Sequence, residues 1–507
     1  MHRYVRSGIV AFLFLVLAVG FIRYATVDAV GSEPVSTVTS ANKDRPICEG
    51  WPKPDFVFFI TGRQHGYIEP CGCTGLSSQK GGIARRQTLF RQLKERGWDV
   101  VPIDVGNQVR RFGPQSAIKF QTTMSALKSM EYDAVGLGPD DLRLDTGELL
   151  SEVVEDTPLV CANLSILDLP VSNGHKIVET KKHRVGITAV VGEKEHRGVR
   201  NDDFLFSDPV KSLEAMSDVF DKENCAVRVL LSHASTEETK KIVLASKKTQ
   251  GYRVVITAGG ADEPALKPER IEGTRSYLIQ TGKKGMYVGV LGVFADSDTP
   301  MRYERVPLDS RFKDSEEMLQ SLKVYQDRLK DAYTRDWEEL GLRAVPHPSG
   351  HEFVGSEACK DCHEHAFDVW ESSPHHHATD GIAFPGERSS IPRHFDPECL
   401  SCHVTGWHPQ DFYPYTSGYV DFDKSKHLHG NGCENCHGPG GSHVAAENGD
   451  VDLTDTQIEM LRKEMVLPLA KAEQHCIQCH DLDNDPDFKE DGAFERYWEE
   501  IEHNEDE

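Results

Sequence analysis

The sequence predicts two domains of different kinds, a layered α/β sandwich followed by a mostly helical and irregular domain. The chain has 507 residues, which exceeds the roughly 100–200 residues of one ordinary domain. Between residues 55 and 310, short apolar runs alternate with helical stretches, as in buried sheets covered by helices. From residue 346 to the end these patterns almost vanish, and His, Cys, Gly and Pro dominate.

The N-terminus has the pattern of an export signal. Arg3 and Arg6 precede an uninterrupted apolar run over residues 9–22, which Arg23 ends. A short apolar run behind positive charge is typical of a secretory signal. Residues 1–30 are therefore predicted to be a signal peptide or, if uncleaved, a membrane anchor, and residues 31–54 a linker. We expect a periplasmic or otherwise extracytoplasmic protein, anchored in the inner membrane by residues 9–22 if the signal stays uncleaved.

The predicted sandwich extends from residue 55 to residue 310. Its apolar runs are short and separated by turn residues or helical stretches, which is the pattern of buried strands. Helical patterns over 84–97 and 235–248 fall between two pairs of these runs. The predicted strands are 56–61, 99–105, 133–137, 158–164, 184–191, 227–233, 252–258, 277–281 and 287–295.

Residues 311–345 are predicted to form a connecting helix. Asp314 and Glu317 have the spacing of a capping box at its start. Its apolar stripe is too short for a coiled-coil dimer, so we expect the helix to pack on one of the two domains. The stripe consists of Leu322, Tyr325, Leu329 and Tyr333 at helical spacing.

The second domain, residues 346–507, contains the pattern Cys-x-x-Cys-His four times. In this pattern the two thiols add to the vinyl groups of a haem, and the adjacent His supplies the proximal iron ligand. Zinc is the alternative for paired cysteines, but it does not explain a His directly after each pair. The sequence therefore predicts four covalently bound c-type haems. The motifs are Cys359-Cys362-His363, Cys399-Cys402-His403, Cys433-Cys436-His437 and Cys476-Cys479-His480.

The remaining histidines of this domain are candidates for distal iron ligands, since two strong axial ligands close the coordination shell and one leaves it open. Residues 352–503 resemble the tetrahaem cytochrome c-554 family, and the four motifs come in the family's order. The resemblance implies a compact stack of haems that relays electrons. Its W-x-x-S-x-H, CHGPG-x-x-H and Y-W-x-x-I-x-H patterns imply His375, His443 and His503 as distal ligands, with His429 as a candidate for the fourth.

Residues 55–300 resemble UshA-like 5′-nucleotidases of the metallophosphoesterase class. The segments that carry the resemblance are TGRQHG (61–66), DVGN (104–107), GPDD (138–141), LSH (231–233) and GGAD (259–262). Within them His65, Asp104 and His233 match metal ligands of the family, whereas Arg63, Asn107, Pro139 and Ala261 replace others. Three donors are too few to hold two cations. The resemblance therefore implies the metallophosphoesterase fold without an intact dinuclear metal site.

The segment EPCGC (69–73) follows the first predicted strand of the sandwich, and it resembles a branch of the UshA-like proteins that this motif marks. Cys71 and Cys73 are candidates for a redox or sulfur-handling pair. Arg63, Arg85 and Arg86 are near in sequence and favour a thiolate or an anionic substrate. The structural alternative is a disulfide to Cys48, Cys161 or Cys225, which export would permit.

The formal net charge is −24, which argues against a nucleic-acid partner and against electrostatic docking on anionic lipid. The leading prediction is an exported multihaem cytochrome that transfers electrons between redox partner proteins. One alternative is an oxidoreductase that acts on a sulfur compound at Cys71 and Cys73, with the haems as relay. Others are an active metal-dependent phosphoesterase, or a sandwich that serves only to dock the partner. The oligomeric state is not specified by these patterns.

Overall fold

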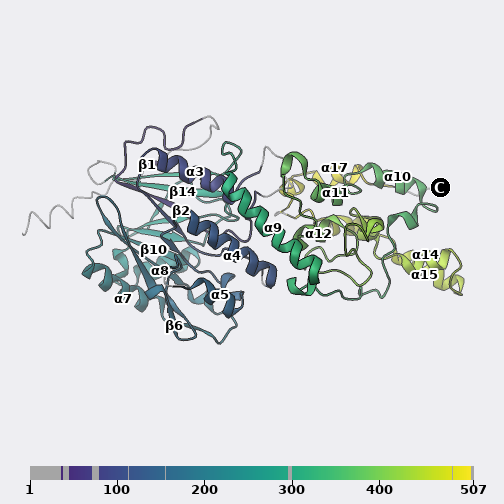
Figure 1. Cartoon of the computed structure of the whole chain (residues 1–507), viewed down its shortest axis with the longest axis horizontal. Coiled ribbons are helices and arrows are strands. Elements are labelled where there is room, and N and C mark those ends of the chain that lie inside the picture. The colour runs from purple at the N-terminus through teal and green to yellow at the C-terminus, as the bar shows by residue number, and fades with distance from the viewer. Residues whose placement is uncertain are drawn as a thin grey trace, which may run out of the picture.

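The computed structural model describes residues 36–37, 45–70, 79–111, 113–154, 156–294, 300–481 and 484–503. The two domains lie side by side along the long axis of the molecule, with helix α9 (Glu316–Asp336) between them (Figure 1). The predicted signal or anchor over residues 1–30 lies outside the described residues. Within the described ranges, every helix is too short or too polar to cross a bilayer.

The first sheet of the sandwich has six strands in the order β1-β15-β14-β2-β3-β4. Strands β2, β3 and β4 are parallel, whereas β14 runs antiparallel to both β2 and β15. The carboxyl ends of the parallel strands β2, β3 and β4 therefore meet at one edge of the sheet. The strands are β1 Ser36–Thr37, β2 Phe56–Thr61, β3 Val100–Asp104, β4 Ala134–Val135, β14 Tyr287–Val293 and β15 Met301–Pro307.

The second sheet also has six strands, in the order β12-β13-β11-β10-β8-β7. Its four central strands are parallel, and each outer strand is antiparallel to its neighbour. The strands are β7 His175–Glu179, β8 Arg184–Val191, β10 Val227–His233, β11 Val254–Thr257, β12 Glu269–Arg270 and β13 Tyr277–Gln280. A small three-stranded sheet adds β5 Cys161–Ile166, β6 Leu169–Val171 and β9 Phe204–Phe206.

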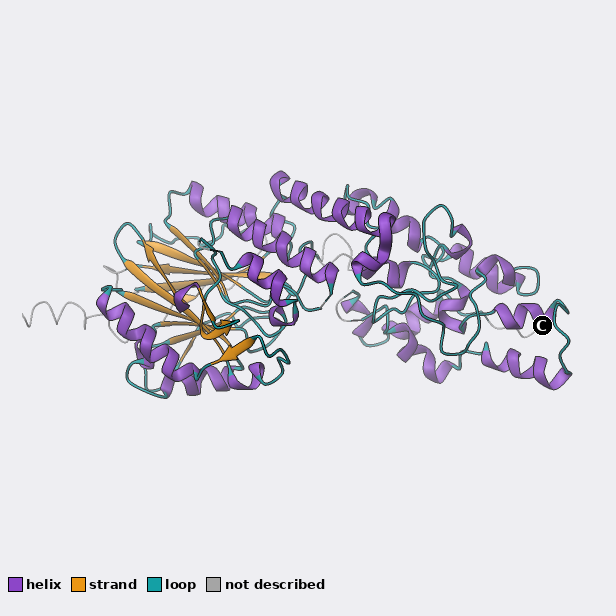
Figure 2. Cartoon of the chain, turned by 60° about the horizontal axis from the view of Figure 1, so that its bottom comes forward, coloured by secondary structure: helices purple, strands orange, loops and turns teal. Residues whose placement is uncertain are grey.

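The two large sheets stack face to face, with helices on their outer faces (Figure 2). Alternate residues of β2 point to opposite faces: Phe56, Phe58 and Ile60 pack between the sheets, while Val57 and Phe59 pack under the outer helices. Both faces of β2 are therefore buried, and the predicted α/β sandwich is confirmed. The helices of this domain are α3 Ile83–Glu95, α4 Pro114–Ser129, α5 Thr146–Glu152, α6 Glu193–His196, α7 Pro209–Lys222 and α8 Thr236–Leu244.

The strand predictions succeed best where the strand is almost wholly buried. The predicted strands 56–61, 184–191 and 227–233 match the structure residue for residue. Residues 158–164 instead give a strand that begins at Cys161. Strands β7 and β15 were not predicted, because β7 is half-exposed and the charged residues of β15 interrupt its apolar pattern.

Helix α9 contacts both domains rather than one. Its predicted apolar stripe is buried and packs against α3 and α4 of the sandwich. On the other side, the Tyr333 hydroxyl donates to the carbonyl of Val420 at 2.7 Å. The predicted capping box is wrong: the N-cap is Ser315, whose hydroxyl accepts from Met318 N, while Asp314 lies 3.6 Å from Arg85.

The second domain consists of short helices joined by irregular segments. Its β structure, among the described residues beyond 345, is limited to isolated β-bridges. Leu400, Val404 and Trp407 belong to the same apolar cluster as Leu329 of α9, so the two domains share a continuous core. The helices are α10 Glu364–Ser372, α11 Ala378–Ala383, α12 Pro397–His403, α13 Cys433–His437, α14 Gly441–Glu447, α15 Asp455–Glu464, α16 Leu469–Cys476 and α17 Ala493–Glu499.

The shared core generates a stability prediction. Leu329 is fully buried, and Val324 on the same helix is 49% exposed. Replacing a buried Leu by Ala leaves a cavity and costs about 2–5 kcal/mol, whereas an exposed substitution changes stability by about 0.5 kcal/mol or less. We expect Leu329→Ala to lower the midpoint of urea unfolding followed by far-UV circular dichroism, and Val324→Ala to leave it nearly unchanged. Equal effects of the two variants would contradict the bridging role of α9.

Candidate functional site

Two of the four Cys-x-x-Cys-His motifs lie on short helices, and the fourth begins at the last residue of one. Helix α12 ends with His403, α13 spans the whole third motif, and α16 ends at the first cysteine of the fourth. One helical turn places residues three apart on the same side, so both cysteines of each helical pair can reach the edge of one macrocycle. The cysteines of the second and third motifs therefore have the spacing of one helical turn.

The imidazole rings of three motif histidines are oriented by hydrogen bonds at Nδ1. The Nδ1 atoms of His403 and His437 lie 2.7 Å from the carbonyl oxygens of Ala378 and Met465. The Nδ1 atom of His480 lies 2.8 Å from an Asp485 carboxylate oxygen. A hydrogen bond at Nδ1 fixes the tautomer and orientation of a ligating imidazole and leaves Nε2 for the metal.

Each of the three distal candidates lies opposite a motif histidine. Imidazole nitrogens bind a metal such as zinc at about 2 Å, so comparable bonds on both sides of one iron would separate the ring centroids by about 6 Å. The observed centroid pairs are His363 with His443 at 6.5 Å, His437 with His503 at 5.8 Å, and His375 with His480 at 6.1 Å. The Nε2 atom of His429 instead lies 2.8 Å from the carbonyl oxygen of Phe422.

Contacts between cysteines arrange the four motifs in a line that differs from their order in the sequence. The side chains of Cys359 and Cys433 are close enough to affect each other's pKa, and so are those of Cys402 and Cys479. Cys436 and Cys476 are close enough to interact electrostatically. The motifs therefore follow one another as first, third, fourth and second. A cavity of about 720 Å³ between the first and third motifs is lined by His443 and His503 among others.

The second motif is attached to the sandwich by polar side chains, which we call the interdomain charge cluster: Arg111, Gln115, Lys119, Asp396 and Glu398. Asp396 caps α12 and accepts hydrogen bonds from Gln115 at 2.7 Å and from Gln326 of α9 at 3.1 Å. Glu398 accepts from Lys119 at 2.5 Å and lies 3.2 Å from Arg111. Helix α12, which carries Cys399 and Cys402, is therefore fixed against α4.

The charges of this cluster are complementary. Lys119 and Asp396 are buried. Burial raises the pKa of the Asp396 carboxyl, and Lys119 acts against this effect. Burial would also raise the pKa of Glu398, but Lys119 and Arg111 together lower it. A buried carboxylate is stable when such partners compensate its lost hydration, so the cluster depends on residues from both domains.

A second ion pair joins the domains near the EPCGC segment. The Arg393 guanidinium binds the Glu69 carboxylate through two nitrogens, with Nε at 2.9 Å. Pro70 and Gly81 pair as an antiparallel bridge. Cys71 and Cys73 lie outside the described residues. The segment that leads into Cys71 is therefore held against the segment that leads into the second motif.

The five nucleotidase-like segments meet at the carboxyl edge of the two sheets. We call Arg63, His65, Asn107, Gly138 and His233 the carboxyl-edge site. Two hydrogen bonds join Asn107 to Asp140: the side-chain amide donates to the carboxylate at 2.9 Å, and the amide oxygen accepts from Asp140 N at 3.0 Å. His233 is buried with only 6% exposed. Burial lowers the pKa of His233 to about 3, with Arg63 and His65 acting in the same direction.

The carboxylates next to this site are engaged in internal hydrogen bonds. Asp104 is fully buried and accepts from Thr61 Oγ1 at 2.5 Å, Gly106 N at 2.8 Å and Gln108 Nε2 at 2.7 Å. Asp141 accepts from several backbone amides, and burial raises its pKa to about 7. Among the described residues, no group of three or more His, Cys, Asp or Glu side chains is placed to hold a metal ion.

Two of the three arginines near the EPCGC segment serve the fold. Arg86 is fully buried, donates to the Gln64 side chain and lies 3.9 Å from Asp104. Arg85 is buried and donates to the carbonyl of Gln79 at 2.8 Å. Each of the three arginines has at least one buried guanidinium nitrogen without a hydrogen-bond partner among the described residues, which for Arg63 is Nη1. Burial lowers the pKa of the Arg63 guanidinium, and the nearby carboxylates of Asp262, Asp140 and Glu195 act against that effect.

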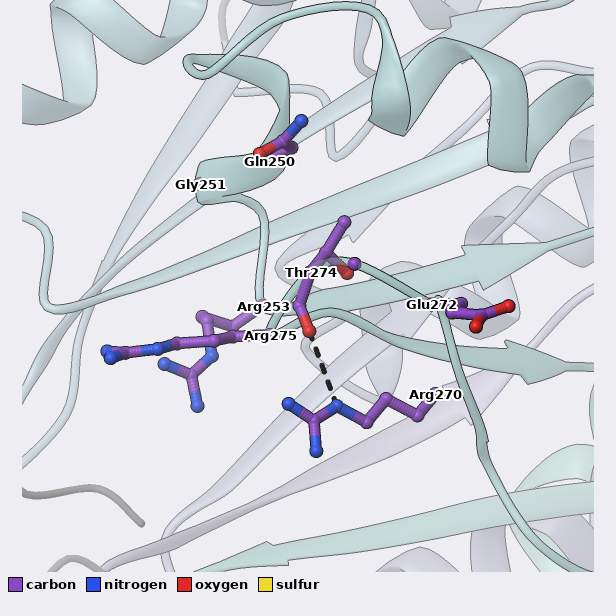
Figure 3. Close-up of a pocket in the computed structure, with 8 residues that line it drawn as sticks. Gln250, Gly251, Arg253, Arg270, Glu272, Thr274 and Arg275 are labelled. Atoms are coloured by element: carbon purple, nitrogen blue, oxygen red, sulfur yellow. Dashed lines mark hydrogen bonds between the residues drawn. The ribbon is translucent and has the colours of Figure 1, made fainter. Parts of the chain in front are cut away.

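An open recess of about 960 Å³ lies near the amino ends of β11 and β13, and Figure 3 shows the arginines Arg253, Arg270 and Arg275 that line it. We call it the arginine recess. Burial lowers the pKa of Arg253, and Arg275 adds to that effect. Arg270 donates to the carbonyl of Thr274 at 3.3 Å. The recess is at the opposite end of these strands from the carboxyl-edge site.

Sequence reasoning did not identify the interdomain charge cluster. The pair Asp396-Pro397 has the signature of a helix start, with a capping Asp and a Pro at the first helical position. That signal marks the beginning of α12 but says nothing about its partners. Lys119 lies 279 residues from Glu398 in the chain, and no local pattern connects residues so far apart.

Two groups of known proteins resemble this chain. The model of the family "Cytochrome c554 and c-prime" matches residues 358–438, which include three of the four motifs. An apyrase from Aedes albopictus is 22% identical over 294 residues, which cover 51% of each chain. A snake venom 5′-nucleotidase from Crotalus adamanteus is 23% identical over 256 residues, covering 44% of this chain and 42% of the relative. The chain spans about half the length of the curated relatives it matches.

Two solved structures superpose on part of this chain. A sulfate thiohydrolase from Thermus thermophilus superposes with a TM-score of 0.47 at 13% identity, covering 57% of this chain and 62% of that one. A 5′-nucleotidase precursor from the same organism gives 0.45 at 18% identity, covering 65% and 66%. The sequence matches to nucleotidases and to the cytochrome family agree with the two resemblances expected from the motifs.

The low pKa of His233 generates a pH prediction. The folded protein keeps this imidazole neutral down to about pH 3, whereas an unfolded His binds a proton below about pH 6.5. Stability must therefore fall as the pH drops below 6.5, by about 1–2 kcal/mol at pH 5 from this residue alone. We expect His233→Gln to lose less unfolding free energy than the native protein between pH 7 and pH 5, measured by urea unfolding. An identical loss in both proteins would show that His233 titrates normally.

Proposed function

We propose that this protein is an exported electron-transfer protein whose second domain carries four covalent c-type haems. The observation that supports the proposal best is the set of three imidazole pairs, each joining a motif histidine to a distal candidate at about 6 Å. Each pair has the separation that one iron with two nitrogen ligands requires. The match to the cytochrome c554 family over three motifs points the same way.

The donor set fits haem c and assigns a role to each residue class. We propose that the eight motif cysteines form the thioether links, that His363, His403, His437 and His480 are proximal ligands, and that His375, His443 and His503 are distal ligands. When bound, haem supplies reversible one-electron chemistry at its iron. The protein orients the imidazoles through their Nδ1 hydrogen bonds and, where two rings face each other, closes the coordination positions to substrate.

The line of motifs gives the proposed relay a direction in space. Its inner end is the second motif, which the interdomain charge cluster holds against the sandwich. Its outer end is the first motif, where Cys362 is exposed. We infer that a redox partner protein docks near the first motif, since electrons can enter or leave there without crossing the sandwich.

We propose that the sandwich no longer hydrolyses phosphoesters. Arg63 stands where a metal ligand is needed and brings a positive charge, and Asn107 is hydrogen-bonded to Asp140. Asp104, the remaining carboxylate match, accepts three internal hydrogen bonds. Two-metal hydrolysis requires ligands that are available to the cations, and these side chains are engaged elsewhere.

A second candidate function is thiol oxidation at Cys71 and Cys73. The ion pair between Glu69 and Arg393 favours it, because Glu69 precedes Cys71 by two residues and Arg393 precedes Cys399 by six. Oxidation of two thiols to a disulfide releases two electrons and two protons, and the cytochrome domain is the proposed acceptor. A disulfide between cysteines separated by one residue is strained and therefore easily reduced.

The cytochrome proposal is tested by haem content and by the iron ligands. We expect four covalent haems per chain by pyridine haemochrome assay combined with intact mass. His443→Ala should convert one low-spin haem to high-spin, seen by electron paramagnetic resonance, because one axial ligand is lost. The matched control is His365→Ala, which removes an exposed histidine of the same domain and should leave the spectrum unchanged. Haem that extracts into acidified solvent, or a count of two or fewer, would contradict the proposal.

The thiol alternative has its own test. The protein is reduced, its haems are oxidised with a one-electron acceptor, and alkylatable thiols are counted by mass spectrometry. If the pair exchanges electrons with the haems, two thiols disappear in the native protein but not in Cys71→Ser. Cys225→Ser, which removes a buried free thiol of the sandwich, should behave as the native protein does. Retention of both thiols in the native protein would leave the cytochrome function alone.

A further inference from the structure

The arginine recess gathers three guanidinium groups at the amino edge of the second sheet. Arg253 directly precedes β11, Arg270 ends β12, and Arg275 lies in the turn that leads into β13. All three residues line the recess, which has a volume of about 960 Å³ (Figure 3). Pockets for small molecules typically measure about 300–1,000 Å³, so the recess has room for a ligand larger than a single ion.

The turn between β12 and β13 is closed by its own hydrogen bonds. Thr274 is buried, and its hydroxyl donates to the carbonyl of Ile271 at 2.7 Å and accepts from Ser276 N at 3.0 Å. Gly273 has a φ of 77°, which glycine adopts without steric cost. Arg270 Nε donates to the carbonyl of Thr274 at 3.3 Å, which orients its guanidinium. The turn is therefore a preorganised support for the side chains that it carries.

Arg253 is the most enclosed of the three arginines. It is half-buried, whereas Arg270 and Arg275 are exposed, and its Nε atom is buried with no hydrogen-bond partner among the described residues. Burial lowers the pKa of the Arg253 guanidinium, and Arg275 and Arg270 act in the same direction, but an arginine stays charged at neutral pH. A partly desolvated cation beside two others is destabilising unless an anion compensates it.

Three carboxylates near the recess are bound to other cations or directed away from it. Glu269 lies 2.6 Å from Lys240, and Asp221 pairs with Arg228. Glu272 lines the recess, but Figure 3 shows its carboxylate directed away from the three guanidinium groups. Three arginines and one glutamate leave the lining with two positive charges in excess.

We propose that the arginine recess binds a phosphate-type dianion, either free or as the phosphate group of a small ester. Guanidinium groups match the oxygens of such an anion through paired, charge-assisted hydrogen bonds. The excess of two positive charges matches the charge of a phosphate group at neutral pH. The acidity of the chain does not oppose this binding, because Lys plus Arg and Asp plus Glu are equally numerous over residues 1–345, so the net charge of −24 belongs to residues 346–507. This inference does not rest on the electron-transfer proposal.

The test is equilibrium binding of inorganic phosphate and of glycerol 3-phosphate to the full haem-loaded chain, measured by isothermal titration calorimetry. We expect one site per chain, and Arg253→Gln should weaken binding by about tenfold or more, since it removes a charged hydrogen bond. The matched control is Arg184→Gln, which removes the same charge at the same edge of the sheet from an arginine already bound to Glu179 and Glu223 and should leave the affinity nearly unchanged. Tighter binding of glycerol 3-phosphate would assign the recess to an ester, and tighter binding of phosphate to the free anion.

Three outcomes would overturn the proposal: no saturable binding of either probe by the native protein, equal weakening by Arg253→Gln and Arg184→Gln, or unchanged affinity in a folded Arg253→Gln protein. Equal weakening would mean that the probes respond to the general charge of this edge rather than to the recess. If Arg253→Gln loses haem or its native thermal midpoint, Arg275→Gln replaces it, because Arg275 is exposed. Binding that this variant leaves unchanged would also refute the proposal.

Discussion

The arrangement of the two domains depends on one buried interaction, the contact of Lys119 and Gln115 with the start of helix α12. Removal of one partner from a buried charge pair typically costs about 3–5 kcal/mol, because the remaining charge is left without compensation. Lys119 of the first domain and Asp396 of the second are both buried. Separation of the two domains would therefore leave each of these charges without its partners from the other domain. This contact fixes the second motif beside the sandwich, and the contacts between cysteines then extend the line of motifs outwards.

The carboxyl edge of the sandwich is held together by internal hydrogen bonds. The carboxylates of Asp104 and Asp141 accept from backbone amides or neighbouring side chains. Their acceptor capacity is therefore used within the fold, where it joins the loops that follow the strands.

The sequence predicted the features that are encoded locally. Apolar runs such as 184–191 become strands with the expected bounds, and the stripe through Leu329 faces the core. Short patterns also led to the three distal candidates, His375, His443 and His503, and each lies near a motif histidine. Half-exposed strands such as β7 were not predicted, because a strand that is buried on one side only has a weak sequence pattern. The sequence did not predict that Lys119 pairs with Glu398, nor the spatial order of the motifs. Both depend on contacts between residues far apart in the chain.

The line of motifs also constrains how the molecule is made. A chain that emerges from its amino end folds its first domain early, so the surface that receives α12 exists before the last motif has been synthesised. Yet the second motif touches the fourth and the first touches the third, and these pairings wait for distant segments. Cys399 and Cys402 are both partly buried in the docked helix. The proposed thioether bonds need reachable sulfurs, so haem attachment at this motif would have to precede the docking of α12.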